Sequence, residues 1–248
     1  SPATAGNFTA AGYYFALELH RELKIPIGLI CTNWGGTRIE PWTCPQGFAA
    51  VPELKSIHEQ VQSWDSTTAL GQTAWRKGLA DLKAWLPKAE AALSATQPMP
   101  DLPNLPRPNS DNRTPTCLYN AMIFPLVPYG IKGAIWYQGE ANGGEGVSYF
   151  HKMKALIQGW RQVWNQGDFP FYYVQLANFQ SPTDEPGAGN GWAKVREAQT
   201  MSLSIPNTGM AVIIDIGEAK DIHPRNKQDV GKRLAQWAFK QTYGRDVV

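Results

Sequence analysis

The sequence has few of the features that mark metal sites, membrane helices or nucleic-acid binding. Its 248 residues include only three cysteines and four histidines, and these lack the spacing of a zinc site. The formal net charge of +2 gives no electrostatic reason to expect nucleic acid or an anionic membrane as a partner. The longest apolar stretch, residues 117–137, is interrupted by proline, glycine and lysine, so no run of about 18 apolar residues predicts a membrane helix.

The odd number of cysteines leaves at least one of Cys31, Cys44 and Cys117 unpaired within the chain. A Cys31–Cys44 disulfide and buried free thiols both remain open, so cysteine does not indicate the compartment. The first residues, SPATAGNF, contain neither an initiator methionine nor a signal-peptide pattern, and they read as a chain that starts partway through a protein. The hydrophobic content of 43% and charged content of 18% are typical of a globular domain.

Alternating strand and helix patterns predict a parallel sheet with helices on both faces. A helical apolar spacing covers residues 8–23, and the β-branched run at 25–34 predicts a buried strand. The alternation then becomes regular, with predicted strands at 130–138, 169–177 and 208–216 and predicted helices at 147–164, 192–204 and 226–244. The fold class expected from this order is α/β.

An insertion separates the first predicted strand from the regular alternation. Residues 52–96 are rich in Ala, Lys, Glu, Gln and Trp, which predicts two helices, with a helical hairpin as one arrangement. Residues 96–115 contain six prolines, which predicts an extended loop. We therefore expect one domain over residues 1–248, with a helical and proline-rich insertion at about 43–115.

Three polar clusters follow predicted strands, where parallel sheets bind their ligands. They are NWGGT at 33–37, WYQGEAN at 136–142 and DIHP at 221–224. Each cluster also has a purely structural explanation, namely a tight turn, a hydrogen-bonded strand end and an inert loop histidine. Their common position at strand ends is what predicts a site.

The second and third clusters contain the residues that indicate chemistry. An amide such as that of Gln138 can donate to a developing oxyanion. Alternatively, Glu140 is the acid of a glycosidase, which requires a second carboxylate roughly 5–9 Å away. His223 is the only histidine at a strand end, and Asp221 precedes it by two residues, which is the base and acid pattern of acyl-transfer triads. Trp34 adjoins the predicted site and could stack on a sugar.

The segments FTAAGYYFALELHRELKIPIGLICTNWGGTRIEPW, LYNAMIFPLVPYGIKGAIWYQGEAN and DIHPRNKQDVGKRLA resemble sialate O-acetylesterases and related carbohydrate acetylesterases. The resemblance runs from about residue 8 to the C-terminus and places the chain in the SGNH-hydrolase superfamily. It implies a three-layer α/β/α sandwich with a parallel sheet. It also implies an enzyme that needs no metal or organic cofactor and acts outside the cell or in the periplasm.

The resemblance also implies roles for individual residues. His223 is the general base, while Gly35 or Gly36 and Gln138 supply the oxyanion hole. Glu140 and Asn142 organise or line the site, and Arg38 and Trp34 are further candidates for substrate binding because they lie near it in the sequence. For Arg38, pairing with a sialic acid carboxylate and a structural salt bridge with Glu40 or Glu140 are both open.

Two departures from the family pattern carry expectations of their own. The usual acid lies three residues before the histidine, but position 220 is lysine here, so Asp221 is the expected acid and Asp215 the alternative. The family's nucleophile is a serine in a G-Q-S-N segment, which this sequence lacks. We therefore expect the serine, and the central first strand that carries it, to come from an upstream segment or a second chain.

The sequence thus predicts a carbohydrate O-acetylesterase that uses a Ser-His-Asp mechanism, with an O-acetylated sugar as substrate. A glycoside hydrolase that uses Glu140 and a non-catalytic carbohydrate-binding module are the two alternatives.

Overall fold

The structure is a computed structural model, and it describes residues 4, 6, 8–109, 111–185 and 191–247. Its centre is a parallel sheet in the order β1 (Ala134–Trp136), β2 (Phe171–Val174) and β3 (Thr208–Ala211). In the register of the sheet, Ala134 lies beside Phe171, and Phe171 lies beside Thr208. The predicted alternation of strands and helices is therefore confirmed.

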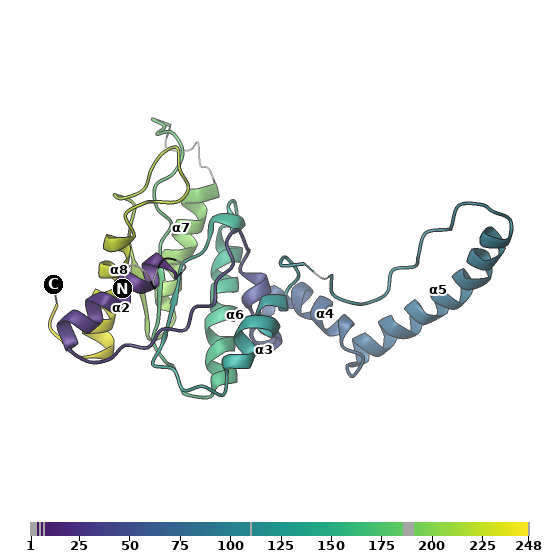
Figure 1. Ribbon diagram of the computed structural model, residues 1–248, viewed down its shortest axis with the longest axis horizontal. Helices are drawn as coiled ribbons and strands as arrows, with labels where there is room; N and C mark the ends of the chain where they lie inside the picture. The colour runs from purple at the N-terminus through teal and green to yellow at the C-terminus, as the bar shows by residue number, and fades with distance from the viewer. Residues whose placement is uncertain (1–3, 5, 7, 110, 186–190, 248) are drawn as a thin grey trace.

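Helices cover both faces of this sheet (Figure 1). One face packs against α2 (Ala10–Leu23) and α8 (Lys227–Trp237), and the other against α6 (Val147–Trp164) and α7 (Gly191–Met201). Alternate residues of β2 point to opposite faces, so Tyr172 belongs to the core under α2 and α8 while Tyr173 belongs to the core under α6. This is the predicted three-layer α/β/α arrangement.

Local sequence signals explain where several helices begin. The side chain of Thr9 caps α2 by accepting the N–H of Gly12, and Asn226 caps α8 by accepting the N–H of Asp229. Short helical turns complete the described chain: 3₁₀ turns at Glu40–Trp42, Pro52–Leu54, Phe124–Leu126, Glu140–Asn142 and Ser202–Ser204, and π turns at Tyr119–Ile123 and Ala238–Thr242.

The predicted strand at 25–34 is wrong as a strand, because this segment is extended but unpaired. No backbone group of residues 26–33 forms a hydrogen bond with another described residue. The segment lies across a groove of about 560 Å³ from β1, and both sides line that groove. Ile30, which the prediction buries, is 51% exposed. An extended segment becomes a strand only where a neighbour accepts its hydrogen bonds, and here β1 lies too far away.

The other strands are shorter than predicted. β3 ends at Ala211, whose carbonyl accepts the last bond of the ladder from the N–H of Gln175. The apolar pattern continues to residue 216, but Val212 and Ile214 are exposed because the chain there runs past the end of β2. Hydrophobicity alone therefore overestimates the length of this edge strand.

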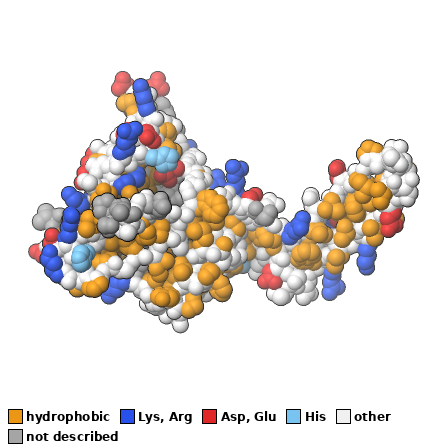
Figure 2. Space-filling model, viewed as in Figure 1, with side chains coloured by type: hydrophobic (Ala, Val, Ile, Leu, Met, Phe, Trp, Pro, Cys, Tyr) orange, Lys and Arg blue, Asp and Glu red, His pale blue; other side chains and the backbone are white. Residues whose placement is uncertain are grey.

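The insertion forms an arm that projects away from the sheet (Figure 1), and the space-filling view in Figure 2 shows the same projection. After α3 (Pro45–Ala49) the chain forms the two predicted helices, α4 (Lys55–Trp64) and α5 (Ala69–Ser94). The proline-rich segment then returns beside α5, where Trp85 Nε1 donates a hydrogen bond to the carbonyl of Pro100. The arm is therefore a helix paired with an extended segment rather than a hairpin of two long helices.

Candidate active site

The loops that follow residues 25–34 and β1 meet at one end of the sheet. A second cavity, of about 240 Å³, is lined by Trp34, Gly35 and Thr37 from the first loop and by Tyr137 and Gln138 from the second. Gly36 has φ +72°, a conformation that a side chain rarely adopts, and it turns the first loop. The first two predicted clusters therefore line one cavity.

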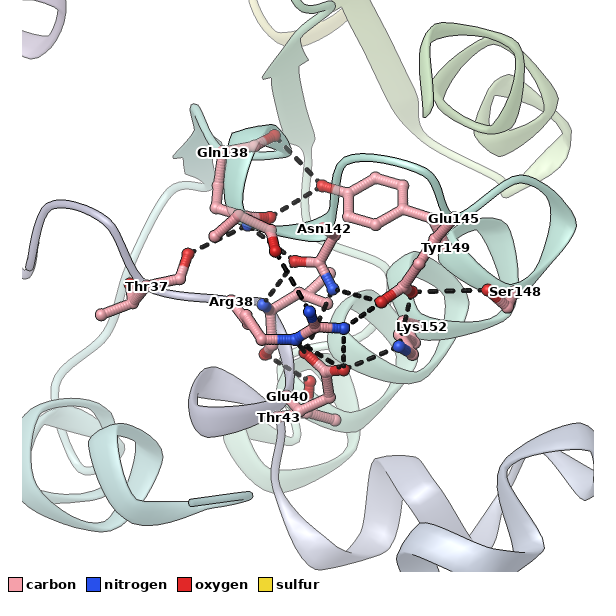
Figure 3. Close-up of polar contacts among 12 residues, drawn as sticks. Thr37, Arg38, Glu40, Thr43, Gln138, Asn142, Glu145, Ser148, Tyr149 and Lys152 are labelled. Atoms are coloured by element: carbon pink, nitrogen blue, oxygen red, sulfur yellow. Dashed lines mark hydrogen bonds and ion pairs between the residues drawn. The ribbon is translucent and has the colours of Figure 1, made fainter. Parts of the chain in front are cut away.

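Gln138 joins the two loops through its amide (Figure 3). Its Nε2 donates to the carbonyl of Thr37 at 3.0 Å and to Oδ1 of Asn142 at 2.8 Å. Its Oε1 accepts a hydrogen bond from the hydroxyl of Tyr149 at 2.9 Å. Because the backbone carbonyl of Thr37 can only accept, its contact with Gln138 fixes which end of the amide carries the N–H groups. Both N–H groups of Gln138 are engaged within the protein.

Asn142 is the centre of this bridge and is 0% exposed. Its Oδ1 accepts hydrogen bonds from the N–H of Ile39 and from Gln138, and its Nδ2 donates to Glu40 and Glu145. Of the two roles expected for Asn142, lining the site and organising it, only the second fits a side chain without exposed surface.

Four charged side chains surround Asn142 (Figure 3). Lys152 from α6 donates to Glu40 at 2.7 Å and to Glu145 at 2.5 Å. Arg38 pairs with the same two carboxylates and donates to the carbonyl of Ala141 at 3.2 Å. The salt bridge expected for Arg38 thus forms with Glu40, and Glu145 takes the place of Glu140 as the second partner.

The charges in this cluster balance one another. Burial acts to raise the pKa of Glu40, but Lys152 and Arg38 outweigh it and hold that pKa below its usual value. For Arg38 burial disfavours the charged form and so acts to lower the pKa. The carboxylates of Glu40 and Glu145 outweigh burial and raise the pKa of Arg38 above its usual value. Glu40 and Arg38 are therefore charged at neutral pH, and the cluster holds the loop at residues 37–40 against the start of α6.

His223 lies on an exposed loop beside Asp221. Oδ1 of Asp221 accepts the backbone N–H of His223 at 2.9 Å and lies 3.6 Å from Nδ1 of its ring. The His223 side chain is 83% exposed. Asp215, the alternative acid, instead forms two hydrogen bonds with the guanidinium of Arg233, at 2.5 and 2.6 Å, which lower its pKa to about 2. The structure thus brings Asp221, and not Asp215, to the histidine.

The histidine loop approaches the end of β1 through Lys227 and Glu140. Nζ of Lys227 donates to the carbonyl of Pro224 at 2.6 Å and lies 5.2 Å from the centre of the Tyr137 ring. Burial raises the pKa of Glu140, although hydrogen bonds from backbone N–H groups and the nearby His223 and Lys227 oppose the shift. The third predicted cluster therefore adjoins the second.

Sequence reasoning missed Glu145, Tyr149 and Lys152. A signal for the lysine was present, because Lys152 falls on the same helical face as Tyr149, Met153 and Leu156, which are buried. A lysine on the apolar face of a helix needs a buried partner. For Glu145 and Tyr149 the neighbouring sequence gives no comparable signal.

The described residues bring the imidazole of His223 and the carboxylate of Asp221 together. No described serine hydroxyl forms a hydrogen bond with the imidazole of His223. Within the described ranges, no group of three or more His, Cys, Asp or Glu side chains is placed to hold a metal ion. No described helix is both long and apolar enough to cross a membrane.

Comparisons with known proteins place these residues in a family context. Residues 112–240 match the sequence profile of the family described as carbohydrate esterase, sialic acid-specific acetylesterase. The chain is 30% identical to sialate O-acetylesterase of the rat (Rattus norvegicus) over 260 residues, which cover 96% of this chain and 44% of that protein. It is 30% identical to the human (Homo sapiens) sialate O-acetylesterase over 256 residues, covering 95% and 39% respectively.

A solved structure gives the same indication. The crystal structure of a carbohydrate acetylesterase from Xanthomonas citri superposes with a TM-score of 0.71 at 36% identity. The superposition covers 100% of this chain and 44% of that one. The chain therefore spans less than half the length of the relatives that it matches.

Proposed function

Because the chain belongs to the sialic acid-specific acetylesterase family of carbohydrate esterases, we propose that it forms part of an enzyme that hydrolyses O-acetyl esters of carbohydrates. The observation that carries the proposal is the pairing of His223 with Asp221 on a loop that Lys227 joins to Tyr137, a residue that lines the cavity between the first two loops. A base with its carboxylate and free backbone amides are the parts that acyl transfer requires besides the nucleophile.

The proposed reaction follows the serine esterase scheme. A serine hydroxyl attacks the acetyl carbonyl, and His223 accepts the serine proton and then gives it to the departing sugar oxygen. Water then attacks the acetyl-enzyme, with His223 again as the base, and acetate leaves. In each half of the reaction, Asp221 orients the imidazole and stabilises its protonated form.

The proposed oxyanion donors differ in whether their N–H groups already form hydrogen bonds within the protein. The N–H groups of Gly35 and Gly36 form no hydrogen bond with another described residue, so they are free to donate to an oxyanion. Gln138 remains the proposed side-chain donor, and its Nε2 must share or release the carbonyl of Thr37 to act in this way. In this proposal, the backbone amides are ready in place and the amide of Gln138 shifts when substrate binds.

We further propose that the nucleophilic serine comes from a strand outside residues 1–248 that fills the groove between residues 27–32 and β1. The groove is lined mostly by apolar side chains, which include Leu19, Ile123 and Trp160. Both of its edges offer unpaired backbone: the 26–33 segment forms no described backbone hydrogen bond, and β1 pairs with β2 on one side only. An apolar strand placed there would satisfy both edges and lead its carboxyl end toward Gly35 and Gln138.

The choice between an acetyl ester and a glycoside as substrate tests the proposed activity. The full-length protein should hydrolyse 4-nitrophenyl acetate and leave 4-nitrophenyl glycosides intact, and His223→Ala should lower turnover on the order of 10⁴-fold without unfolding the protein. Turnover of the glycosides would support the glycosidase that uses Glu140. Sugar binding without any turnover would support a binding module.

A serine-directed fluorophosphonate tests the source of the nucleophile. Mass spectrometry of the labelled full-length protein should find the adduct on a serine outside residues 1–248. An adduct on one of the ten serines within this range would refute the proposal.

For the substrate, we propose that Trp34 stacks on the sugar and that Arg38 organises the site. Trp34 is largely exposed at the mouth of the cavity, whereas the donors of Arg38 are engaged by Glu40, Glu145 and Ala141. A panel of O-acetylated sialic acid and acetylated neutral sugars separates the substrate classes. The resemblance to the family also supports an extracellular or periplasmic location, which fractionation of the source cells would test.

A further inference from the structure

Lys227 contacts two parts of the proposed site although it lies outside the three predicted polar clusters. Its Nζ donates to the carbonyl of Pro224, the residue that follows His223, at 2.6 Å. The same ammonium lies 5.2 Å from the centre of the Tyr137 ring, on the residue that precedes Gln138. One side chain therefore connects the histidine loop with the end of β1.

The position of this lysine is unfavourable by ordinary criteria. Lys227 is the first residue of α8, where the free N–H groups of the helix already carry partial positive charge. Its side chain is half-buried, and burial lowers its pKa, against the carboxylates of Glu140, Asp221 and Glu218. No described carboxylate lies close enough to Nζ to form an ion pair. A positive charge in such a place needs another explanation.

The loop around His223 has few other attachments. At its N-terminal end, the N–H of Gly217 donates to Oδ1 of Asn178, and the carbonyl of Ala219 accepts the N–H of Gln180. Beyond Asp221, the hydrogen bonds of residues 222–225 remain within the loop or go to the first residue of α8. Ile222 packs against the core, and the carbonyl of Pro224 is the hydrogen-bonded point nearest the histidine at which a side chain from a helix holds the loop.

We propose that Lys227 is a positioning residue that fixes the His223 loop against the end of β1. The proposal rests on the function proposed above, since it assigns Lys227 to the placement of that reaction's base. The ammonium binds the Pro224 carbonyl and the face of the Tyr137 ring at the same time, which requires the loop and the strand end to keep one separation. Because misplacement of a base by about 1 Å can cost on the order of 100-fold in rate, this tether acts on turnover.

The test compares three variants of the full-length protein. Lys227→Met keeps the length of the side chain but removes the charge and the donor, Lys227→Arg keeps both, and Lys232→Met removes an exposed lysine from the same helix. For the hydrolysis of 4-nitrophenyl acetate we expect Lys227→Met to lower kcat by about 10- to 100-fold. KM should change by less than about 2-fold, because the tether places the base rather than the substrate.

The two other variants separate positioning from general stability. Lys227→Arg should recover most of the lost kcat, and Lys232→Met should match the unchanged protein. Wild-type kcat in Lys227→Met would overturn the proposal. A loss of kcat that arises only with an equal loss of folded protein, or that arginine does not recover, would overturn it as well.

Hydrogen exchange gives a readout that does not depend on turnover. In Lys227→Met the backbone amides of residues 222, 223 and 225 should exchange faster than in the unchanged protein, while those of β2 should not change. If the full-length protein proves inactive on acetyl esters, the proposed function fails, and the exchange rates still decide whether Lys227 holds the loop. Unchanged exchange in this loop would refute the tether.

Discussion

One carboxylate oxygen of Asp221 serves both the backbone and the ring of His223. Oδ1 accepts the backbone N–H of His223 at 2.9 Å, and it lies 3.6 Å from Nδ1 of the same residue. The first contact fixes the turn of the loop. The second lies just beyond hydrogen-bond distance, so a small rotation of the exposed imidazole would complete the proposed base and acid pair.

Asp221→Asn should therefore lower kcat strongly while keeping the loop in place. The amide oxygen of asparagine still accepts the N–H of His223, but the negative charge that stabilises the protonated ring is lost. In serine hydrolases the equivalent change lowers kcat on the order of 10⁴-fold. Because His223 and Asp221 are exposed in this structure, we expect a loss of kcat no larger than this. Steady-state kinetics on 4-nitrophenyl acetate measures it.

Asp215→Asn is the matched control for this variant. It replaces an aspartate of the same chain region that binds Arg233 instead of His223, so kcat should stay close to that of the unchanged protein. If Asp215→Asn lost more kcat than Asp221→Asn, the role of the acid would pass to Asp215.

Gln138→Ala should lower kcat by about 10²–10³-fold and change KM less, because an oxyanion donor acts chiefly on the transition state. Tyr149→Phe is the control, since it removes the hydrogen bond to Oε1 of Gln138 but leaves the amide N–H groups. It should keep most of kcat. If Gln138→Ala and Tyr149→Phe both lowered kcat, and each by no more than its lower melting temperature explains, Gln138 would be a structural bridge alone.

The sequence predicted those features that depend on local patterns. The helix at 147–164 has the observed bounds of α6, because its apolar residues recur without interruption at helical spacing. The segment at 25–34 has an equally clear strand pattern, but a strand also needs a partner, and the partner is a property of distant chain. The same limit applies to the charged cluster, where Arg38 and Glu145 are 107 residues apart.

The site followed the same division. His223 and Asp221 are close in sequence and could be predicted as a pair, whereas the engagement of Asp215 with Arg233 could not, because it depends on where α8 packs. The burial of Asn142 also depends on packing, since the sequence around it has the polar character of an exposed loop. The sequence could therefore predict which polar residues belong to the site. It could not predict which of them face the substrate and which support the others.

Glu140→Gln should stabilise the protein in a pH-dependent way. Burial raises the pKa of Glu140 in the folded state above its value in the unfolded chain, so the folded protein holds this proton more tightly. Stability from this group is therefore complete below the unfolded pKa, near 4.5, and is lost as pH rises through the folded pKa. Glutamine cannot ionise, so this loss disappears.

The melting temperatures at two pH values measure the effect. The difference between Glu140→Gln and the unchanged protein should be larger at pH 7.5 than at pH 4, with the variant more stable at the higher pH. Glu90→Gln, which replaces an exposed glutamate of α5, should show no such trend. An equal difference at both pH values would mean that the carboxyl of Glu140 is not buried in the full-length protein.

Ile30→Asp tests whether a strand fills the groove. In this structure Ile30 is 51% exposed, and Leu93 at the tip of the arm is 72% exposed. By exposure alone, aspartate at either position should be nearly neutral, within about 0.5 kcal/mol. If a strand covers the groove, Ile30 is buried in the full-length protein, and its replacement by a carboxylate should cost several kcal/mol of unfolding free energy, roughly the cost of burying an unpaired charge.

Urea unfolding of the full-length variants measures both values under the same conditions. Ile30→Asp should unfold at a clearly lower urea concentration than the unchanged protein, and Leu93→Asp should not. Ile30 is the less exposed of the two in this structure, so a loss of several kcal/mol, and not the order of the two variants alone, is what indicates a covered groove. Two neutral variants would mean that the groove stays open to solvent, and the strand that should bring the serine beside His223 would have to be sought elsewhere.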